Sequence, residues 1–237
     1  MKNQLLERFL VHGEIESIEQ VTRRMRRIRL AGPAIGELAW VPGQQIRVYV
    51  GELTALRSWR EGLLRTYSVW ERAAETLDLC VFDHGGDGPG ARWSRETKVG
   101  QPVLFTKPEG RLVTRPAEYH VFAGEETASV AFGPMLRALP ADARIHGVVE
   151  VDSAEGQLPL PDQIDWRYRE GRSAASSTAL VAAVAALPLP DEPGVAYVAG
   201  EARTIQAVRD QLVRDRGWPR QSVITKPFWT PGKRGLD

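Results

Sequence analysis

The sequence predicts a chain of two halves: an antiparallel β half followed by an α/β half built on a parallel sheet. In the first half, short apolar strands are separated by turn signals such as Gly32-Pro33 and Pro42-Gly43. In the second half, apolar strands alternate with helical segments, which is typical of a parallel sheet covered on both faces. A length of 237 residues with 43% hydrophobic residues suits two domains that each have a core. We expect the domains to span residues 1–115 and 116–237.

Short strands with polar connections make up the expected first half. They are expected at residues 9–18, 25–30, 45–50, 65–70, 76–82 and 103–106. The fourth and fifth strands should form a hairpin around the polar turn 71–75, and a short helix is expected over residues 91–97. Arginines cross the second strand, and we interpret them as a solvated face. They are Arg23, Arg24, Arg26, Arg27 and Arg29.

Strands and helices alternate through the expected second half. The strands are expected at residues 119–123, 145–151, 164–168, 195–199 and 222–225, and the helices at residues 127–139, 177–187 and 204–216. Turns begin at Gly124 and Gly200, each at the carboxyl end of a strand, where ligands of open α/β sheets bind. Neither turn carries the G-x-G-x-x-G fingerprint of the standard dinucleotide fold, but together they favour a nucleotide site.

The stretch Arg65-Thr66-Tyr67-Ser68-Val69 is the most informative part of the first half. On a strand, Arg65, Tyr67 and Val69 share one face. Thr66 and Ser68 share the other. An arginine can hold a phosphate, a tyrosine can lie against a ring, and a hydroxyl can hydrogen-bond a ring nitrogen. Taken alone, the stretch resembles an ordinary barrel strand with a polar edge, so its neighbours along the chain decide its meaning.

A glycine-rich segment, residues 83–90, follows that strand after about the length of one hairpin and leads into the expected helix. Backbone N–H groups at such a helix entry can approach and neutralise phosphate oxygens. A surface loop with a helix cap would explain this segment by itself. Two elements able to bind phosphate at hairpin distance favour a flat, phosphorylated cofactor.

Composition excludes several classes of protein and site. Lys+Arg 31 against Asp+Glu 30 leaves a formal charge of +1, which argues against a dedicated nucleic-acid binder. The single cysteine, Cys80, excludes an internal disulfide and a zinc or iron–sulfur site held by cysteines. The histidines lack metal-binding spacing, so we expect no metal site. No apolar run approaches a signal sequence or a membrane span, and a soluble cytoplasmic protein is expected.

Blocks of residues along the chain resemble the siderophore-interacting proteins, which are flavin reductases of the ferredoxin–NADP reductase superfamily. The blocks are Arg65–Val69, His84 with Asp87–Trp93, Gly124–Ala128, Tyr197–Ala202 and Phe228–Lys233. The resemblance covers nearly the whole chain, and its specificity lies in the order and spacing of the blocks. It implies a Greek-key β-barrel that binds FAD, followed by a parallel α/β domain that binds NAD(P)H.

The resemblance also implies roles for single residues. Arg65 would hold a flavin phosphate, Tyr67 would pack on the isoalloxazine, and Ser68 would reach its N5 region. The residues expected to bind the flavin are Arg65, Thr66, Tyr67, Ser68, His84, Gly88, Gly90 and Ala91. This chain departs from the family pattern at Trp70, where a second arginine is common, and at Ala91, where a serine is common.

Further residues would bind the nicotinamide nucleotide and the iron chelate. Thr127 and the pair Gly200-Glu201 would border the nucleotide, and Phe228 or Trp229 would lie near the flavin ring. Ferric siderophores are often anionic, so basic residues would help to bind them. The residues expected to contact the siderophore are Lys107, Lys226, Lys233 and Arg234.

The implied reaction is reduction of Fe(III) in a siderophore, which releases Fe(II). NAD(P)H would deliver a hydride to the flavin, and the flavin would pass single electrons to the iron. No catalytic acid, base or metal ligand of the protein is required, so its work is positioning and electrostatics. Two alternatives stay open: a general NAD(P)H–flavin reductase, and a carrier that binds a siderophore without reducing it.

Overall fold

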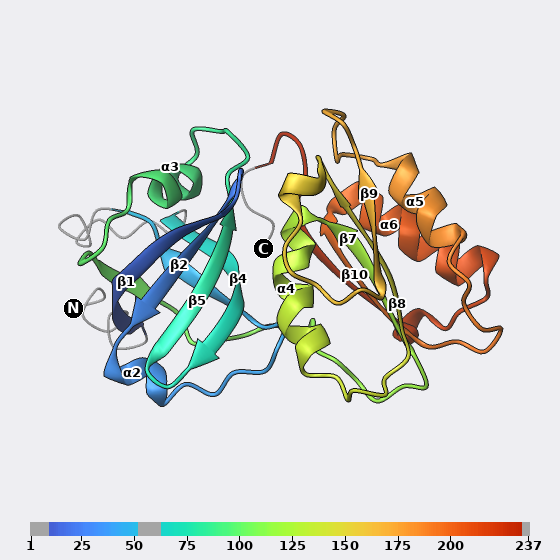
Figure 1. The fold of residues 1–237 in the computed structure, drawn as a ribbon, viewed down its shortest axis with the longest axis horizontal. Coiled ribbons are helices and arrows are strands. Elements are labelled where there is room, and N and C mark those ends of the chain that lie inside the picture. The colour runs from blue at the N-terminus through green and yellow to red at the C-terminus, as the bar shows by residue number, and fades with distance from the viewer. Residues whose placement is uncertain (1–9, 52–62, 234–237) are drawn as a thin grey trace. The chain divides into compact units, whose positions relative to one another are not determined.

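A computed structural model describes residues 10–51 and 63–233 of the chain (Figure 1). The chain divides into two compact units, Met1–Arg111 and Leu112–Asp237, and each is described by itself. The first is an antiparallel β-barrel and the second a parallel sheet covered by helices, as the sequence predicts. The boundary expected between residues 115 and 116 stays a prediction.

The first unit is a closed six-stranded barrel with the strand order β1-β2-β5-β4-β3-β6. Its strands are β1 (Val11–Thr22), β2 (Met25–Ala31), β3 (Gln45–Tyr49), β4 (Leu64–Ala73), β5 (Thr76–Phe82) and β6 (Pro102–Phe105). Two helices accompany them, α2 (Pro33–Gly36) and α3 (Pro89–Glu96), of which the first was not expected. Apolar side chains of all six strands fill the barrel core, Phe105 among them.

The hairpin of β4 and β5 is tighter than the sequence predicts. Glu71, Arg72 and Ala73 still pair with β5, so the turn consists of Ala74 and Glu75 rather than residues 71–75. Ala74 adopts a φ of 47°, the left-handed conformation that a two-residue hairpin turn requires. The polar composition of residues 71–75 indicated a loop, but polar residues also suit the solvent side of a strand.

The interpretation of the arginines at residues 23–29 as a solvated face is wrong for all of them except Arg23, which is exposed. Arg27 and Arg29 both bond the carboxylate of Asp78, which is 2% exposed on the neighbouring strand β5. Arg26 donates to backbone carbonyls at the end of α3, and Arg24 donates to the carbonyl of Asp83 at 2.9 Å. The partners come from segments far along the chain, which a local charge pattern does not indicate.

The second unit is a five-stranded, fully parallel sheet with the order β11-β10-β7-β8-β9. Its strands are β7 (His120–Glu125), β8 (Ile145–Val151), β9 (Ile164–Tyr168), β10 (Val195–Glu201) and β11 (Val223–Trp229). Its helices are α4 (Glu126–Arg137), α5 (Thr178–Ala185) and α6 (Ala202–Asp210), and α6 continues into a π-helical turn, η4 (Gln211–Asp215). Short 3₁₀ turns lie at η3 (Ala154–Gly156) and η5 (Arg220–Ser222).

The helices cover both faces of this sheet because its strands are apolar on both sides. α4 packs on one face, where Phe132 contacts Phe122 with ring centroids 5.2 Å apart. α5 and α6 pack on the other face, where Leu180 and Val208 lie in one cluster with Val121 (Figure 1). Parallel sheets are buried in this way, and their strands therefore read as nearly continuous apolar runs.

Strand β11 is longer than expected and ends at Trp229 instead of residue 225. The strand includes Pro227, which is tolerated because β11 is an edge strand, where a missing backbone N–H leaves no neighbouring strand unpaired. The pairing with β10 skips one residue, because Gly200 pairs with Pro227 and Glu201 with Trp229. Such a bulge re-aims the side chains that come after it.

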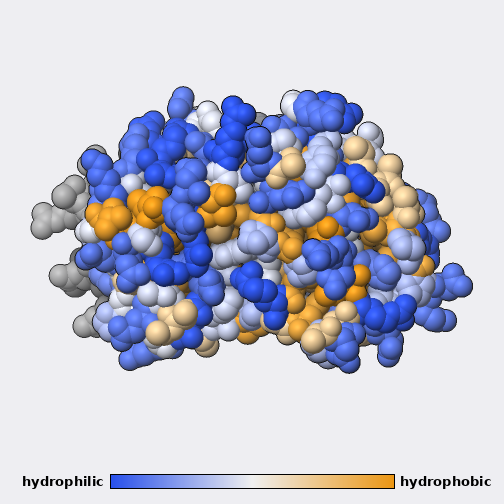
Figure 2. Space-filling view, viewed as in Figure 1, coloured by the Kyte–Doolittle hydropathy of each residue, from blue (hydrophilic) through white to orange (hydrophobic). Residues whose placement is uncertain are grey.

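The face of the molecule drawn in Figure 2 is mostly polar. On the face drawn in Figure 2, hydrophilic residues predominate and hydrophobic residues lie in groups between them. Among the described residues, the large hydrophobic side chains with high exposure are those of Val41, Val99 and Tyr168. Within residues 10–51 and 63–233, no helix combines the length and the apolar character that crossing a membrane demands.

Candidate functional site

In the barrel, strand β4 brings the predicted residues Arg65 and Tyr67 against the start of α3. The hydroxyl of Tyr67 donates to the carbonyl of Gly90 at 3.3 Å, and its ring lies 5.5 Å from that of Trp93. A Cβ on Gly90 would lie 2.9 Å from the Tyr67 hydroxyl oxygen and 3.0 Å from Cγ of Arg65. Only glycine at position 90 therefore lets the helix approach β4 this closely.

Burial raises the pKa of the Tyr67 hydroxyl, and the nearby charge of Arg65 opposes this only in part. The hydroxyl therefore keeps its proton at neutral pH and acts as a donor. Thr66 is exposed, and strand alternation places it with Ser68 on the side of β4 opposite Tyr67. The structure thus separates the predicted flavin residues of this strand into two sets.

Helix α3 begins at Pro89, two residues before the expected start. Its N-cap is Gly88, which provides no side-chain hydrogen bond to the first turn. The first N–H groups of a helix lack intrahelical partners and carry the positive end of its dipole. Space around Gly88 is open, because a Cβ there would meet no atom within 4 Å. The start of α3 therefore fits a phosphate group, and the buried Ala91 can take part only through its backbone.

Arg95, a residue that the sequence did not single out, holds the glycine-rich loop in place. Its guanidinium donates to Oδ1 of Asp83 at 3.0 Å and to the carbonyl of Gly86 at 2.9 Å. The N–H of Gly85 donates to the same Asp83 oxygen at 2.9 Å, and this bond, with the help of Arg95, holds the Asp83 pKa below its usual range against the effect of burial. His84 accepts from the N–H of Gly86 at 3.2 Å.

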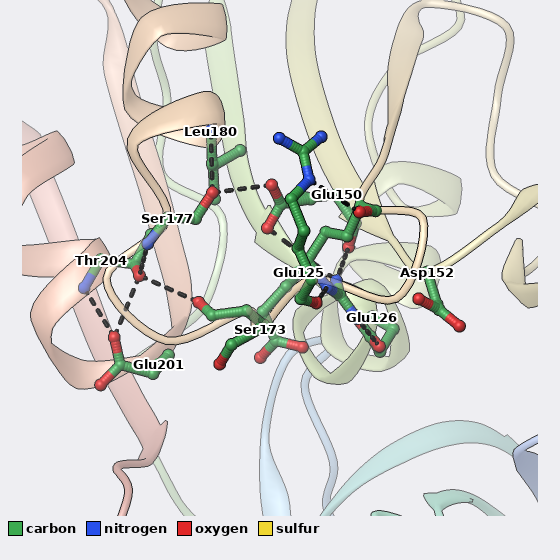
Figure 3. A network of polar contacts seen from close by, with 12 residues as sticks. Glu125, Glu126, Glu150, Asp152, Ser173, Ser177, Leu180, Glu201 and Thr204 are labelled. Atoms are coloured by element: carbon green, nitrogen blue, oxygen red, sulfur yellow. Dashed lines mark hydrogen bonds and ion pairs between the residues drawn. The ribbon is translucent and has the colours of Figure 1, made fainter.

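In the second unit, strands β7 and β10 lie side by side and end in the two predicted glycine turns. Each strand ends in a glutamate that caps the following helix. Glu125 accepts a bond from the N–H of Thr127 at 2.9 Å, and Glu201 accepts one from the N–H of Thr204 at 2.9 Å. A glutamate at this position also suits the positive end of the helix dipole. Figure 3 shows the polar network around these caps.

Glu125 lies at the centre of the predicted nucleotide residues. Besides the bonds from the N–H and hydroxyl of Thr127, it accepts a bond from the indole Nε1 of Trp229 at 3.0 Å. Gly200 lies against it, since a Cβ there would be 2.6 Å from Oε1 of Glu125. Burial, followed by the charge of Glu126, raises the pKa of Glu125 to about 7. The structure thus gathers Thr127, Gly200 and Trp229 around a glutamate that was not predicted as a site residue.

The pKa of Glu201 is shifted in the direction opposite to that of Glu125. Burial raises its pKa, but backbone N–H groups led by those of Ser176 and Thr204 outweigh this effect and leave the pKa below the usual value. Its other oxygen accepts a bond from the hydroxyl of Thr230 at 3.1 Å. Glu201 therefore stays ionised at neutral pH with both oxygens occupied.

A second group of buried residues lies beside these caps. Arg169 forms a buried ion pair with Glu126, with Nη1 at 2.5 Å from Oε2. Glu150 accepts from the hydroxyl of Ser177 at 2.7 Å, and burial raises its pKa. Ser177 also caps α5 by accepting from the N–H of Leu180 at 3.1 Å (Figure 3). In the part of the chain that the structure describes, no group of three or more candidate ligands is arranged to hold a metal ion.

The basic residues predicted to bind a siderophore are distributed over both units. Lys107 is exposed in the first unit, Lys226 is half-buried on β11, and Lys233 is exposed beyond that strand. Arg234 lies outside the described residues. These four assignments stay predictions.

Sequence reasoning missed Glu125, Thr230 and Arg95. The sequence did contain a signal for Glu125. In both turns a glutamate lies between the strand and the helix, and a threonine follows it two or three residues later. The contacts of Arg95 with the loop gave no comparable signal.

Two family models match this chain over most of its length. A model described as a siderophore-interacting FAD-binding domain matches residues 14–112, and one described as a siderophore-interacting protein matches residues 117–232. The ferric vibriobactin reductase ViuB of Vibrio cholerae is 30% identical over 178 residues, which cover 71% of this chain and 65% of that protein. The chain thus spans about 65% of the length of this relative.

Solved structures share the whole fold. The siderophore-interacting protein SipS from Aeromonas hydrophila aligns with a TM-score of 0.80 and 27% identity, covering 94% of this chain and 92% of that one. A siderophore utilization protein from T. fusca aligns with a TM-score of 0.82 and 22% identity, covering 96% and 95%. With a matching FAD-binding barrel, a matching second domain and solved relatives over its whole length, the chain belongs to the siderophore-interacting protein family.

Proposed function

We propose that the chain is a reductase of ferric siderophores that uses FAD and NAD(P)H. The observation that carries the proposal is the contact between β4 and the start of α3, inside the region that matches the FAD-binding domain. There Arg65 and Tyr67 meet Gly90 beside a helix start that has no side-chain cap. This arrangement fits a cofactor that carries both a phosphate and a ring.

The residues of the barrel would bind and orient the flavin. A bound flavin supplies the conversion of a two-electron donor into one-electron steps, which Fe(III) requires. The first N–H groups of α3 and the guanidinium of Arg65 would neutralise the pyrophosphate. Arg95 would keep the loop before α3 in the shape that leaves this helix end accessible. Tyr67 would offer its ring to the flavin ring system. The contact of Ser68, on the other side of β4, with the flavin N5 region stays a prediction.

The second unit would bind the nicotinamide nucleotide where β7 and β10 end. Open α/β sheets bind ligands at the carboxyl ends of their strands. Glycine at position 200 lets the end of β10 pack closely against the Glu125 side chain, and Thr127 lies in the first turn of helix α4 beside it. Use of a reduced nicotinamide nucleotide supports the cytoplasm as the place of the reaction.

The proposed substrate is a ferric siderophore, as the name of the relative from Vibrio cholerae suggests. Lys107, Lys226 and Lys233 would attract an anionic chelate. The reduced iron would leave because Fe(II) is held less tightly by the chelator.

The test is an anaerobic absorbance experiment on the purified full chain. We expect flavin bands that bleach when NADPH or NADH is added and return when a ferric siderophore is added. Bleaching without recovery would leave a general flavin reductase and overturn the siderophore assignment. A colourless protein that takes up no FAD on reconstitution but binds a ferric chelate would be a carrier, and the reductase proposal would be wrong.

A further inference from the structure

Two glutamates hold two consecutive residues at the end of β11. Glu125, at the end of β7, accepts from the indole Nε1 of Trp229 at 3.0 Å. Glu201, at the end of β10, accepts from the hydroxyl of Thr230 at 3.1 Å. Each glutamate uses its other oxygen to cap a helix, through Thr127 and Thr204 respectively. We call the four residues Glu125, Glu201, Trp229 and Thr230 the strand-end clamp.

The glutamates of the clamp are not available to a ligand. Glu125 is 2% exposed and Glu201 is 0% exposed, and both oxygens of each accept hydrogen bonds from the protein. Trp229, by contrast, is only half-buried. A molecule at these strand ends would therefore meet the indole and not the carboxylates that hold it.

The indole reaches across one strand to make its contact. In the sheet, β10 lies between β11, which carries Trp229, and β7, which carries Glu125. Gly200 permits this path, because a Cβ on it would lie 2.6 Å from the Glu125 carboxylate that the indole bonds. The bulge that skips Phe228 in the pairing of β10 with β11 lies directly before Trp229. The indole thus reaches from β11 past the end of β10 to the end of β7.

The hydrogen bond engages only the edge of the indole. An aromatic ring tethered through its N–H is fixed in orientation while its π face stays able to stack on a planar ligand. Fixing the ring in advance lowers the entropy that binding would otherwise cost. These features suit a rigid platform for a heteroaromatic ring.

We propose that Glu125 and Glu201 are positioning residues that fix Trp229 as a stacking platform for the nicotinamide nucleotide. The inference rests on the proposed function, because it names the surface against which that nucleotide packs. It departs from what the family resemblance implies in two ways: Glu201 has an indirect part in place of a direct contact, and Trp229 packs on the nicotinamide nucleotide in place of the flavin ring. It also gives Thr230 the task of holding the backbone that carries the indole.

The groups around Glu125 affect its ionisation. Facing Glu125 are Glu126 and Arg169, which form an ion pair with each other, and the uncharged groups of Thr127 and Trp229. Glu126 therefore keeps a counterion of its own, and the bonds to Glu125 come from neutral donors. These donors favour the ionised form of Glu125, whereas burial and the charge of Glu126 oppose it and raise the pKa of Glu125 overall.

The first measurement is the NMR signal of the Trp229 indole N–H in the full chain labelled with ¹⁵N-tryptophan. The signal is assigned as the one that Trp229→Phe removes. In Glu125→Ala we expect it to shift and its hydrogen exchange to accelerate at least tenfold. In Ser177→Ala we expect no change, because the hydroxyl that this variant removes bonds Glu150 and the N–H of Leu180 and no residue of the clamp. An unchanged indole signal in Glu125→Ala would overturn the clamp.

The second measurement is the dissociation constant of NADP⁺ and of NAD⁺, determined by calorimetry on the same variants. We expect binding of the preferred nucleotide to weaken about tenfold in Glu125→Ala and in Thr230→Val. Trp229→Phe keeps an aromatic face but has no N–H, so it should weaken binding to a similar degree. The double variant Glu125→Ala/Trp229→Phe should lose no more than either single variant, because both remove one interaction.

The outcomes separate the clamp from the proposed function. Binding that is unchanged or tighter in Glu125→Ala and in Trp229→Phe, with a normal wild-type affinity, would overturn the platform alone. Additive losses in the double variant would also contradict it. If the wild-type chain binds neither nucleotide, the nucleotide part of the proposed function is wrong, and so is the role of Trp229 as a platform. If Glu125→Ala does not fold, Trp229→Phe and Thr230→Val decide the question.

Discussion

Glu125 links the chemistry of one carboxyl group to the stability of the second unit. Burial and the neighbouring Glu126 raise its pKa from the ordinary value of 4.5 to about 7. The folded chain therefore binds this proton more tightly than the unfolded chain does. The stability that this proton contributes is fully present below about pH 4.5 and is lost as the pH rises through about 7.

We predict that Glu125→Gln flattens the pH dependence of stability between pH 5 and 8. One proton contributes a slope of at most about 1.4 kcal/mol per pH unit, and an amide does not titrate. Denaturant unfolding at several pH values gives the slope. Glu155→Gln, at an exposed glutamate, should keep the slope of the wild type. A Glu125→Gln variant with the wild-type slope would show that Glu125 titrates normally in the folded chain.

Gly90 and Gly88 provide a matched pair at the start of α3. We predict that Gly90→Ala lowers stability by about 1–3 kcal/mol, because the new methyl group would lie 2.9 Å from the Tyr67 hydroxyl and force the strand and helix apart. Gly88→Ala should cost about 0.5 kcal/mol or less, because its methyl group meets no atom within 4 Å. Thermal unfolding measures both. Equal costs would mean that α3 does not pack closely against β4.

At the scale of elements, the glycine-rich loop depends on a side chain from the helix that comes after it. We predict that Arg95→Ala weakens FAD binding about tenfold, because the loop loses its bonds to Asp83 and Gly86. Quenching of flavin fluorescence on binding gives the dissociation constant. Arg92→Ala is the control, since Arg92 makes a single long contact of 3.5 Å with the carbonyl of Asp87. Similar affinities for Arg95→Ala and the wild type would exclude a positioning role for Arg95.

The pairing of β2 with β5 depends on a buried carboxylate. We predict that Asp78→Ala destabilises the barrel by about 1–3 kcal/mol, because Arg27 and Arg29 lose their shared partner inside the protein. Glu71→Ala removes an exposed partner of the same Arg27 and should cost about 0.2–1 kcal/mol. Urea unfolding separates the two. A larger loss for Glu71→Ala would contradict the view that burial decides the strength of these contacts.

At the scale of the whole molecule, the formal charge is only +1, so an anionic substrate would be attracted by local basic groups and not by the net charge. We predict that Lys107→Ala, Lys226→Ala and Lys233→Ala each raise the KM for an anionic ferric siderophore about two- to fivefold, as expected for a solvent-accessible charge. The KM for NAD(P)H should stay the same in Lys107→Ala. Steady-state kinetics at two salt concentrations test this, with the exposed Lys98→Ala as the control. An effect of Lys98→Ala as large as the others would indicate general attraction only.

Local patterns in the sequence determined the two kinds of fold and nearly all of the strands. Apolar periodicity locates β8 and β9 at their observed bounds, and glycines mark the ends of β7 and β10. The strand character of Arg65–Val69 and the glycine-rich entry to α3 also arise from local chemistry. These features are local because backbone conformation and side-chain alternation depend mostly on near neighbours.

Tertiary structure alone decided which of these segments meet. The barrel order places β2 beside β5, which pairs arginines with Asp78 and overturns their interpretation as a solvated face. The bond from Trp229 to Glu125 joins residues 104 positions apart and turns two ordinary helix caps into a clamp. Side-chain partners and the pKa of Glu125 depend on burial, and burial is set only when the strands assemble. The sequence therefore shows which groups are present, and packing decides what each of them touches.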